Sequence, residues 1–429
     1  MMPQNEITIF AEVIKGQEQS LRDCLEKIDA DVNNNSLLPF SRMSENLHFA
    51  RFIFLPAPDS VISSKLVFLA NVDCSQSSFL EEMVKTCGTG IDQVFNHCEG
   101  YPERSSRDNQ AREVFLKQNM IPASAYYVNT IGRSVKQILS EAKLRDEIQY
   151  FLDQSNNHAS KAATQIRQDI IDHISKHEFL PDLLKKREAP PQSWKIKEQA
   201  RFITILAMLI VLGIILFPFV LVWIVIVQIL ENNDKRSQQR PDIQRLTALR
   251  ANEDYLAHNQ FSAVGFIKPG IIRLITLQVV LFIANFTLRH IYNKGDLAAV
   301  PPLGLDGVDT IHFARWVMID NNKRLFFASN YDGSLESYMG DFVDKVAWGL
   351  NLVFSNGIDY PKTRWLVFEG ARDEQAFKNF ISNRQLFTQV WYAPYGHLTA
   401  VNIANNEAIR DGLHGEMNEV EAQRWLQRF

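Results

Sequence analysis

The sequence contains one domain-sized pattern twice. The motif His-Phe-Ala-Arg occurs at residues 48–51 and again at residues 312–315. Downstream, residues 65–102 align without a gap on residues 324–361, because 324 − 65 and 361 − 102 both equal 259. Each copy is far longer than the repeat of a solenoid protein, so the chain is predicted to carry a duplicated domain.

Within each copy the apolar spacing predicts the element order β-α-β-β-α-β, the arrangement called ferredoxin-like. The second and third strands are apolar on both faces, which predicts that both faces of each sheet are buried. We therefore predict an α+β fold in which two tandem ferredoxin-like repeats form a pseudo-dimeric α/β barrel, with an inserted helical membrane segment. The first copy is predicted to begin with a strand over residues 7–14, and the second with a strand over residues 263–268.

Where the alignment stops, the composition changes, and these changes set the predicted boundaries. The predicted segments are the first repeat (1–148), an amphipathic helical insertion (149–200), a hydrophobic membrane segment (201–230), a polar linker (231–260), the second repeat (261–413) and a C-terminal helix (414–429).

A long uncharged segment points to a membrane. Residues 202–230 contain no charged side chain, and as one helix they would span roughly 44 Å, more than the ~30 Å hydrocarbon core. Both flanks are basic, which favours the cytoplasmic side for both ends. We predict a re-entrant hairpin that turns at Pro218, with residues 271–292 lying at the interface as an amphipathic helix. The alternative is a second crossing through residues 271–292.

Composition excludes some classes of function. The net charge of −4 and a pI near 6.2 give no electrostatic case for nucleic acid. The four cysteines lack metal-site spacing and are predicted to be free thiols in a reducing compartment, with disulfides as the alternative, and no metal site is expected. No GxGxxG, GxSxG or HExxH motif occurs, so nucleotide-dependent and hydrolase functions gain no support.

Polar residues gather at one end of each predicted hairpin. The turn register places His312 opposite Tyr331, beside Asn330 and Asp332. The equivalent residues of the first copy are His48, Asn71 and Asp73, with His48 opposite Val72. A histidine, a carboxylate and an amide together can orient an imidazole for ligation or proton transfer. The alternatives are a structural His–Asp hydrogen bond or an aspartate that caps the following helix.

Arg51 and Arg315 lie in mid-strand between apolar neighbours, and a buried guanidinium needs a partner. It is predicted to hold a carboxylate, a propionate or a peroxide-derived oxygen, or else to pair with Asp73 and Asp332 or with the facing copy. The second copy is richer in aromatic residues and carries His397, so a pocket is expected there.

Two ferredoxin-like copies in tandem resemble the dimeric α/β-barrel superfamily, distantly like its dye-decolourising peroxidases and chlorite dismutases. The resemblance covers residues 7–148 and 261–413 by element order, and Tyr331-Asp332-Gly333 stands where those peroxidases carry Gly-x-x-Asp-Gly. It implies haem held against the second copy, with His312 and His397 as candidate ligands. Implied catalytic residues are His312, Arg315, Tyr331, Asp332 and His397; implied cofactor-binding residues are His312, Arg315, Asn330 and His397.

The sequence therefore predicts a membrane-associated, peroxidase-like oxidoreductase that acts on a lipid or another apolar substrate. The alternative is a non-catalytic membrane-anchored barrel that binds a small apolar ligand or scaffolds a membrane assembly. The expected partners are the lipid membrane, an apolar small molecule and other copies of the chain, with no nucleic acid.

Overall fold

A computed structural model describes residues 3–32, 37–43, 45–154, 161–178, 180–187, 190–235, 240–251, 256–295, 297–298 and 308–429. The first half contains β1 (Asn5–Glu12), α1 (Glu18–Asp29), β2 (Leu47–Leu55), β3 (Lys65–Val72), α2 (Gln76–Phe95), α3 (Asn109–Gln118) and β4 (Ala125–Val128). Helices α4 (Val135–Gln154), α5 (Ala163–Ser175), α6 (Gln192–Asn232) and α7 (Ile243–Arg250) follow. The second half contains β5 (His258–Phe266), α8 (Ile271–His290), β6 (Ile311–Ile319), β7 (Arg324–Asp332), α9 (Leu335–Phe354), β8 (Thr363–Arg364), β9 (Phe368–Glu369), α10 (Glu374–Arg384), β10 (Val390–Tyr392), α11 (Ala400–Asp411) and α12 (Glu419–Leu426).

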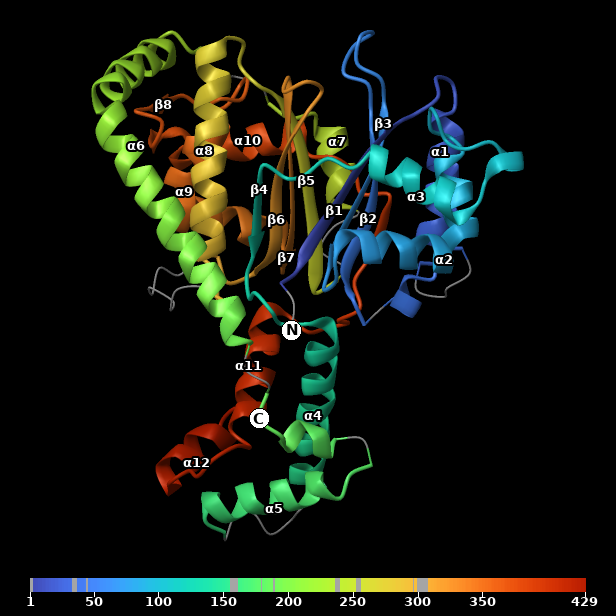
Figure 1. Ribbon diagram of the computed structural model, residues 1–429, viewed down its shortest axis with the longest axis vertical. Helices are drawn as coiled ribbons and strands as arrows, with labels where there is room; N and C mark the ends of the chain where they lie inside the picture. The colour runs from blue at the N-terminus through green and yellow to red at the C-terminus, as the bar shows by residue number, and fades with distance from the viewer. Residues whose placement is uncertain are drawn as a thin grey trace.

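Two four-stranded antiparallel sheets stand side by side in the centre of the molecule (Figure 1), with strand orders β1-β3-β2-β10 and β4-β6-β7-β5. The register predicted for the two hairpins is confirmed along most of their length, because Ala50 lies opposite Ala70 and Phe313 opposite Asn330. The strand predicted over residues 263–268 begins earlier, at His258, inside the segment predicted as a polar linker.

The last strand of each half pairs with the sheet of the other half. Strand β4 pairs with β6, and β10 pairs with β2. Just before these strands, isolated bridges join Met120 to Ile9 and Gln385 to Ala263, so each connecting segment touches an edge strand of its own half. The fold is α+β with antiparallel sheets. Because the joining contacts are single bridges rather than continuous ladders, the described residues do not form the closed barrel that was predicted.

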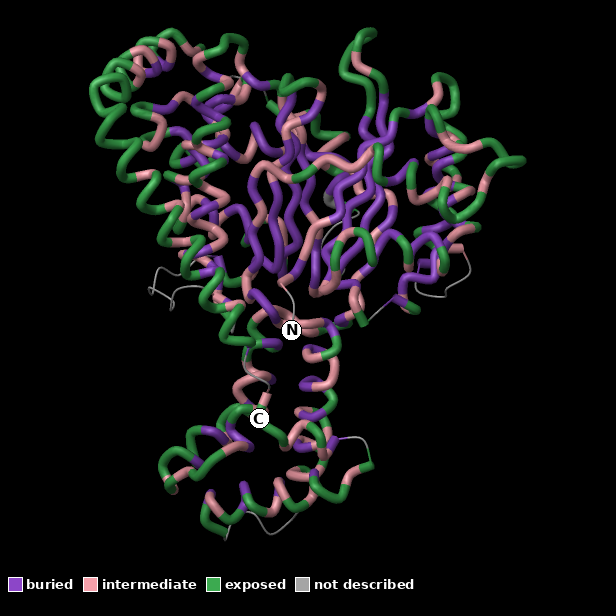
Figure 2. Tube along the Cα trace, in the orientation of Figure 1, coloured by how far each residue is buried: buried purple, intermediate pink, exposed green. Residues whose placement is uncertain are grey.

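Both faces of the central strands are buried, as their two-sided apolar pattern predicted. Strands β2, β3 and β7 are buried along their whole length, and Figure 2 shows buried residues through both sheets. Helices α1, α2 and α3 lie on the outer side of one sheet, and α8, α9 and α10 lie beside the other (Figure 1). Between the sheets the apolar core consists of Phe10, Ile53, Leu55, Val67, Leu69, Val317, Ile319, Phe326, Ala328 and Leu386.

Below the sheets, α4 and α11 descend as a stalk that ends in α5 and α12 (Figure 1). The stalk has its own core, which includes Leu144, Ile148, Ile170, Ile409 and Trp425. The Trp425 indole nitrogen donates to the Ile409 carbonyl at 3.0 Å, and this hydrogen bond docks α12.

Helix α6 runs as one helix through Pro218, so the predicted reversal at this residue is wrong. A proline inside a helix removes one hydrogen bond and bends the axis, and here the helical backbone continues on both sides of it. Helix α6 lies beside α8: Phe202 stacks on Phe286 at 5.5 Å, and the Trp223 indole donates to the Thr276 hydroxyl at 2.9 Å. By length and composition, α6 and α8 are the helices of the described chain that allow membrane association.

Candidate functional site

A β-bulge in each hairpin redirects the histidine of the repeated His-Phe-Ala-Arg motif. In the second half Ile311 pairs with Tyr331 and Phe313 with Asn330, so His312 is the extra residue of its strand. The β2–β3 hairpin has the same shift around His48. A bulge turns the extra side chain away from the regular alternation of the strand. The predicted pairing of His312 with Tyr331, and of His48 with Val72, is therefore wrong by one residue.

Each redirected histidine bonds to the aspartate that closes its hairpin. The distance from Nε2 of His312 to Oδ1 of Asp332 is 2.7 Å, and the His48–Asp73 pair has the same distance. The second oxygen of Asp332 accepts from the Ala400 backbone amide at 2.6 Å, where α11 begins.

The first half repeats this contact. Asp73 accepts from the Val135 amide, at the start of α4, at 2.7 Å. The two aspartates therefore hold the N-termini of the stalk helices, where the helix dipole favours negative charge. The predicted capping of the helices that directly follow the hairpins is wrong, because Ser75 and Ser334 cap α2 and α9.

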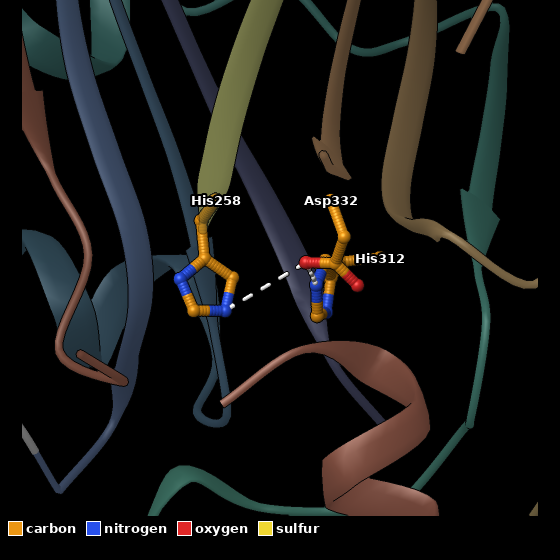
Figure 3. A group of neighbouring side chains, drawn as sticks. All are labelled: His258, His312 and Asp332. Atoms are coloured by element: carbon orange, nitrogen blue, oxygen red, sulfur yellow. Dashed lines mark hydrogen bonds and ion pairs between the residues drawn. The ribbon is translucent and has the colours of Figure 1, made fainter. Parts of the chain in front are cut away.

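A second histidine, which the sequence analysis missed, joins the site of the second half. His258 opens β5 opposite Asp332, and its Nε2 lies 3.8 Å from Oδ1 of Asp332. Figure 3 shows both imidazoles turned toward the Asp332 carboxylate. The His258 Nε2 also donates to the Leu398 carbonyl at 2.5 Å. Burial, and then the neighbouring His312, lower the pKa of His258 to about 4, so this imidazole is neutral at physiological pH.

Aromatic rings enclose this end of the space between the sheets. Phe49 contacts the rings of His258, His312, Phe313 and Tyr395 at centroid distances of 5.3–5.9 Å. A cavity of about 40 Å³ remains there, and its lining includes His48 and His312. This volume has room for water, whereas pockets for small organic ligands measure roughly 300–1,000 Å³.

The two mid-strand arginines fasten the sheets to each other. Arg51 donates from β2 to the Phe261 and Ser329 carbonyls of the other sheet, each at 3.0 Å. Arg315 donates from β6 to the Ile7 carbonyl at 2.7 Å. Of the partners predicted for these guanidinium groups, the structure provides the facing half.

The predicted amides also lie between the sheets: Asn330 donates from its amide nitrogen to the Asn71 side-chain oxygen at 2.9 Å. Two other predicted site residues lie elsewhere. Tyr331 faces the opposite side of β7, where its ring stacks on Tyr338 at 4.0 Å. His397 is exposed in the loop between β10 and α11. The structure thus brings together His312, Asp332 and, unexpectedly, His258.

The site of the second half brings two imidazoles and one carboxylate together. The side-chain ligand atoms of His258, His312 and Asp332 all lie within 4.8 Å of one another. A haem iron would need an imidazole nitrogen facing a much larger space than the cavity beside His312, so the surrounding side chains would have to move apart. Haem binding stays a prediction for a spectrum to test.

Comparison of the chain with models of protein families, with curated proteins and with solved structures finds no match.

Proposed function

We propose that the chain is a membrane-attached protein whose sheets lie on one side of a bilayer, with α6 lying along the bilayer surface. The observation that carries this proposal is the exposed apolar length of α6. Ile203, Ile214 and Val225 expose 62%, 71% and 54% of their surface, and Figure 2 shows exposed residues along most of α6. Continuous apolar surface of this extent is typical of a membrane or protein contact.

Polar contacts at both ends of α6 favour this flat orientation. Near the first end, the buried Glu198 accepts from Arg289 of α8 at 3.0 Å. At the last turn, the buried Glu231 accepts from the Thr363 hydroxyl at 2.5 Å and from the Leu366 amide at 3.0 Å. Placing the ends of α6 on opposite sides of a bilayer would break these contacts and strand buried carboxylates.

The contacts between the halves support a common side for both. Arg51 and Arg315 cross from one sheet to the other, so a bilayer between the halves would separate buried hydrogen-bonded groups. Lys195 and Arg201 before the uncharged stretch, and Lys235 after it, are exposed. Basic side chains at these positions favour the anionic cytoplasmic leaflet. The cytoplasmic side of the membrane is therefore the proposed location.

In this proposal the paired halves are tandem ferredoxin-like repeats that serve as a non-catalytic platform. The order of strands and helices within each half supports the repeats, and the bridges at Ile9 and Ala263 support a barrel-like relation between the sheets. The platform would organise a membrane assembly, including further copies of the chain, or bind a small apolar ligand. The filled space between the sheets favours the first of these roles.

The depth of α6 in a bilayer tests the orientation. Residues 203 and 214 lie in the part of α6 before Pro218, on one face and roughly 16 Å apart along the axis, and residue 225 lies in the part after it (Figure 1). We expect spin labels at Ile203→Cys, Ile214→Cys and Val225→Cys to report similar depths in liposomes. The labels would be placed in a chain whose four native cysteines are replaced by alanine, and depth would be measured by accessibility to oxygen and to a nickel chelate.

A spanning helix would give a clearly different pattern, with the label at 214 deep and the outer labels near opposite surfaces. That outcome would overturn the flat orientation, although not membrane attachment. Membrane attachment itself would be overturned if the chain fails to float with anionic liposomes and is released from membranes by a carbonate wash. A label at Val61, which is exposed on the β2–β3 turn, provides the control for a residue outside the bilayer.

A second candidate function is the peroxidase-like oxidoreductase. The specific observation in its favour is His258, which adds a third ligand-type side chain to the site of the second half. If haem is the cofactor, the purified protein will show a Soret band, and His312→Ala or His397→Ala will remove it. A colourless protein that lacks this band would leave the platform function.

A further inference from the structure

We infer that His258, His312 and Asp332 form a binding site for one divalent transition-metal ion of the zinc class. The three side chains are buried, and they come from the three neighbouring strands β5, β6 and β7. Two imidazoles and one carboxylate are a common protein ligand set for zinc, with a fourth position left for water. This inference does not depend on the proposed membrane function.

The two halves differ at the one position that completes this set. Extending the β1–β3 register by one residue places Gln4 opposite Asp73, as His258 lies opposite Asp332. Gln4 tethers the loop before α4, because its amide nitrogen donates to the Arg133 carbonyl at 2.6 Å and its oxygen accepts from the Gly132 amide at 2.8 Å. A glutamine therefore suffices for the structural role, and a histidine adds a metal ligand.

The histidines of the two halves also differ in their partners. His48 bonds through Nε2 to Asp73 and through Nδ1 to the Tyr395 hydroxyl. Tyr395 has no aromatic counterpart in the loop before α4, where the aligned residue is Thr130. His48 and His312 both line the cavity of about 40 Å³, so water can reach both imidazoles, and the difference between the halves lies in the Tyr395 contact.

The distances require only small movements. Zinc holds its ligands at about 2.0–2.2 Å, which places two ligands of a tetrahedral ion roughly 3.4 Å apart. The His312–Asp332 pair at 2.7 Å would open, and the His258–Asp332 pair at 3.8 Å would close.

The protons can also be accommodated. Each imidazole would bind through Nε2 after its proton moves to Nδ1, so no proton has to leave the site. For His258 this step gives up the hydrogen bond from Nε2 to the Leu398 carbonyl. For His258, the Gly396 carbonyl also faces the ring and is an acceptor for that proton. Such a carbonyl partner is the usual second contact of a metal-bound histidine.

Equilibrium dialysis and visible spectroscopy of the detergent-purified full chain test the site, with Zn²⁺ and Co²⁺ as the probes after treatment with a chelator. We expect one Zn²⁺ per chain, and a Co²⁺ complex with visible absorption of a four- or five-coordinate ion. The His258→Gln substitution, which installs the residue of the first half, should weaken binding by more than the 10–100-fold that loss of a second-shell partner costs.

Two further variants complete the test. Asp332→Asn should also abolish the site, and its side-chain oxygen can still accept from the Ala400 amide. His48→Gln, in the equivalent pair of the first half, should leave the stoichiometry and the Co²⁺ spectrum unchanged. Thermal unfolding of each variant identifies any that fail to fold. Absence of binding to the unmodified chain, or equal binding by the folded His258→Gln chain, would overturn the inference.

Discussion

Removal of one mid-strand arginine is a direct test of how the two sheets are joined. Arg51 is buried and donates to the Phe261 and Ser329 carbonyls and to the Ser262 hydroxyl, each at 3.0 Å. It also donates to the Asn330 side chain. Arg51→Met keeps much of the apolar stem of this side chain and removes its donors, so the four acceptors lose their partner across the sheets.

The size of the effect follows from two opposing contributions. A hydrogen bond to a charged group contributes about 1.5–3 kcal/mol, so four such bonds amount to roughly 6–12 kcal/mol. Burying the guanidinium costs several kcal/mol, and the substitution recovers that cost. Burial and the nearby charge of Arg315 lower the pKa of Arg51 well below its ordinary value, which reflects this cost. The expected net loss in the free energy of unfolding is about 3–5 kcal/mol.

The assay is urea unfolding of the full chain in a fixed detergent, followed by circular dichroism, with the midpoint and slope compared between variants. Arg315→Met should cost a comparable amount, because Arg315 donates to the Ile7 and Ala70 carbonyls and to the Thr8 hydroxyl. Arg364→Met is the control at an exposed position and should change stability by less than about 0.5 kcal/mol. A loss below about 1 kcal/mol for Arg51→Met would refute the view that the arginine fastens the sheets.

Two further predictions concern the stalk. Burial raises the pKa of Glu141 to about 7 from its ordinary 4.5, so its stabilising contribution is complete below about pH 4.5 and is lost as the pH rises through about 7. The free energy of unfolding of Glu141→Gln, minus that of the unmodified chain, should therefore increase by up to about 3 kcal/mol from pH 5 to pH 8, measured by urea midpoints. A difference that stays the same at both pH values would contradict this. A Cβ at Gly412 would lie 2.1 Å from the Trp425 ring, so Gly412→Ala should cost about 1–3 kcal/mol in thermal unfolding. The matched control, Gly340→Ala in α9, meets nothing within 4 Å and should gain about 0.5–1 kcal/mol; equal effects of the two substitutions would contradict the packing argument.

The hairpins could be predicted from sequence because local patterns determine them. A short turn and a two-sided apolar pattern determine the register, and the pairing of Ala50 with Ala70 follows. The bulges at His48 and His312 could not be predicted in this way. Side chains still alternate between the two faces of the strand before and after the extra residue, so the sequence does not mark the bulge. The sequence also carried no sign that β4 and β10 each pair with the sheet of the other half. A strand of four or three residues pairs equally well, by composition, with either sheet.

The missed histidine has a different explanation. His258 lies next to a polar segment and was assigned to the linker, although the alternation in Gln260-Phe261-Ser262-Ala263-Val264 continues the strand toward it. The reversal predicted at Pro218 failed for a physical reason as well: one missing hydrogen bond bends a helix, and a reversal needs a loop of several unpaired residues.

Comparison of the two halves distinguishes residues that the fold requires from residues that give one half a chemical role. His48 and Asp73 hold the start of α4 with the same geometry by which His312 and Asp332 hold the start of α11. A pair that appears in both halves is therefore explained by the fold alone. A chemical role must come from what differs between the halves, and at this site the difference is His258 in place of Gln4. Exchanging those two residues in one chain, with His258→Gln and Gln4→His together, should move metal binding to the first half, where Nε2 of His48 already lies 2.7 Å from Asp73 and the Tyr395 hydroxyl can accept the Nδ1 proton. A folded double variant that binds no metal would show that other differences between the halves also decide the site.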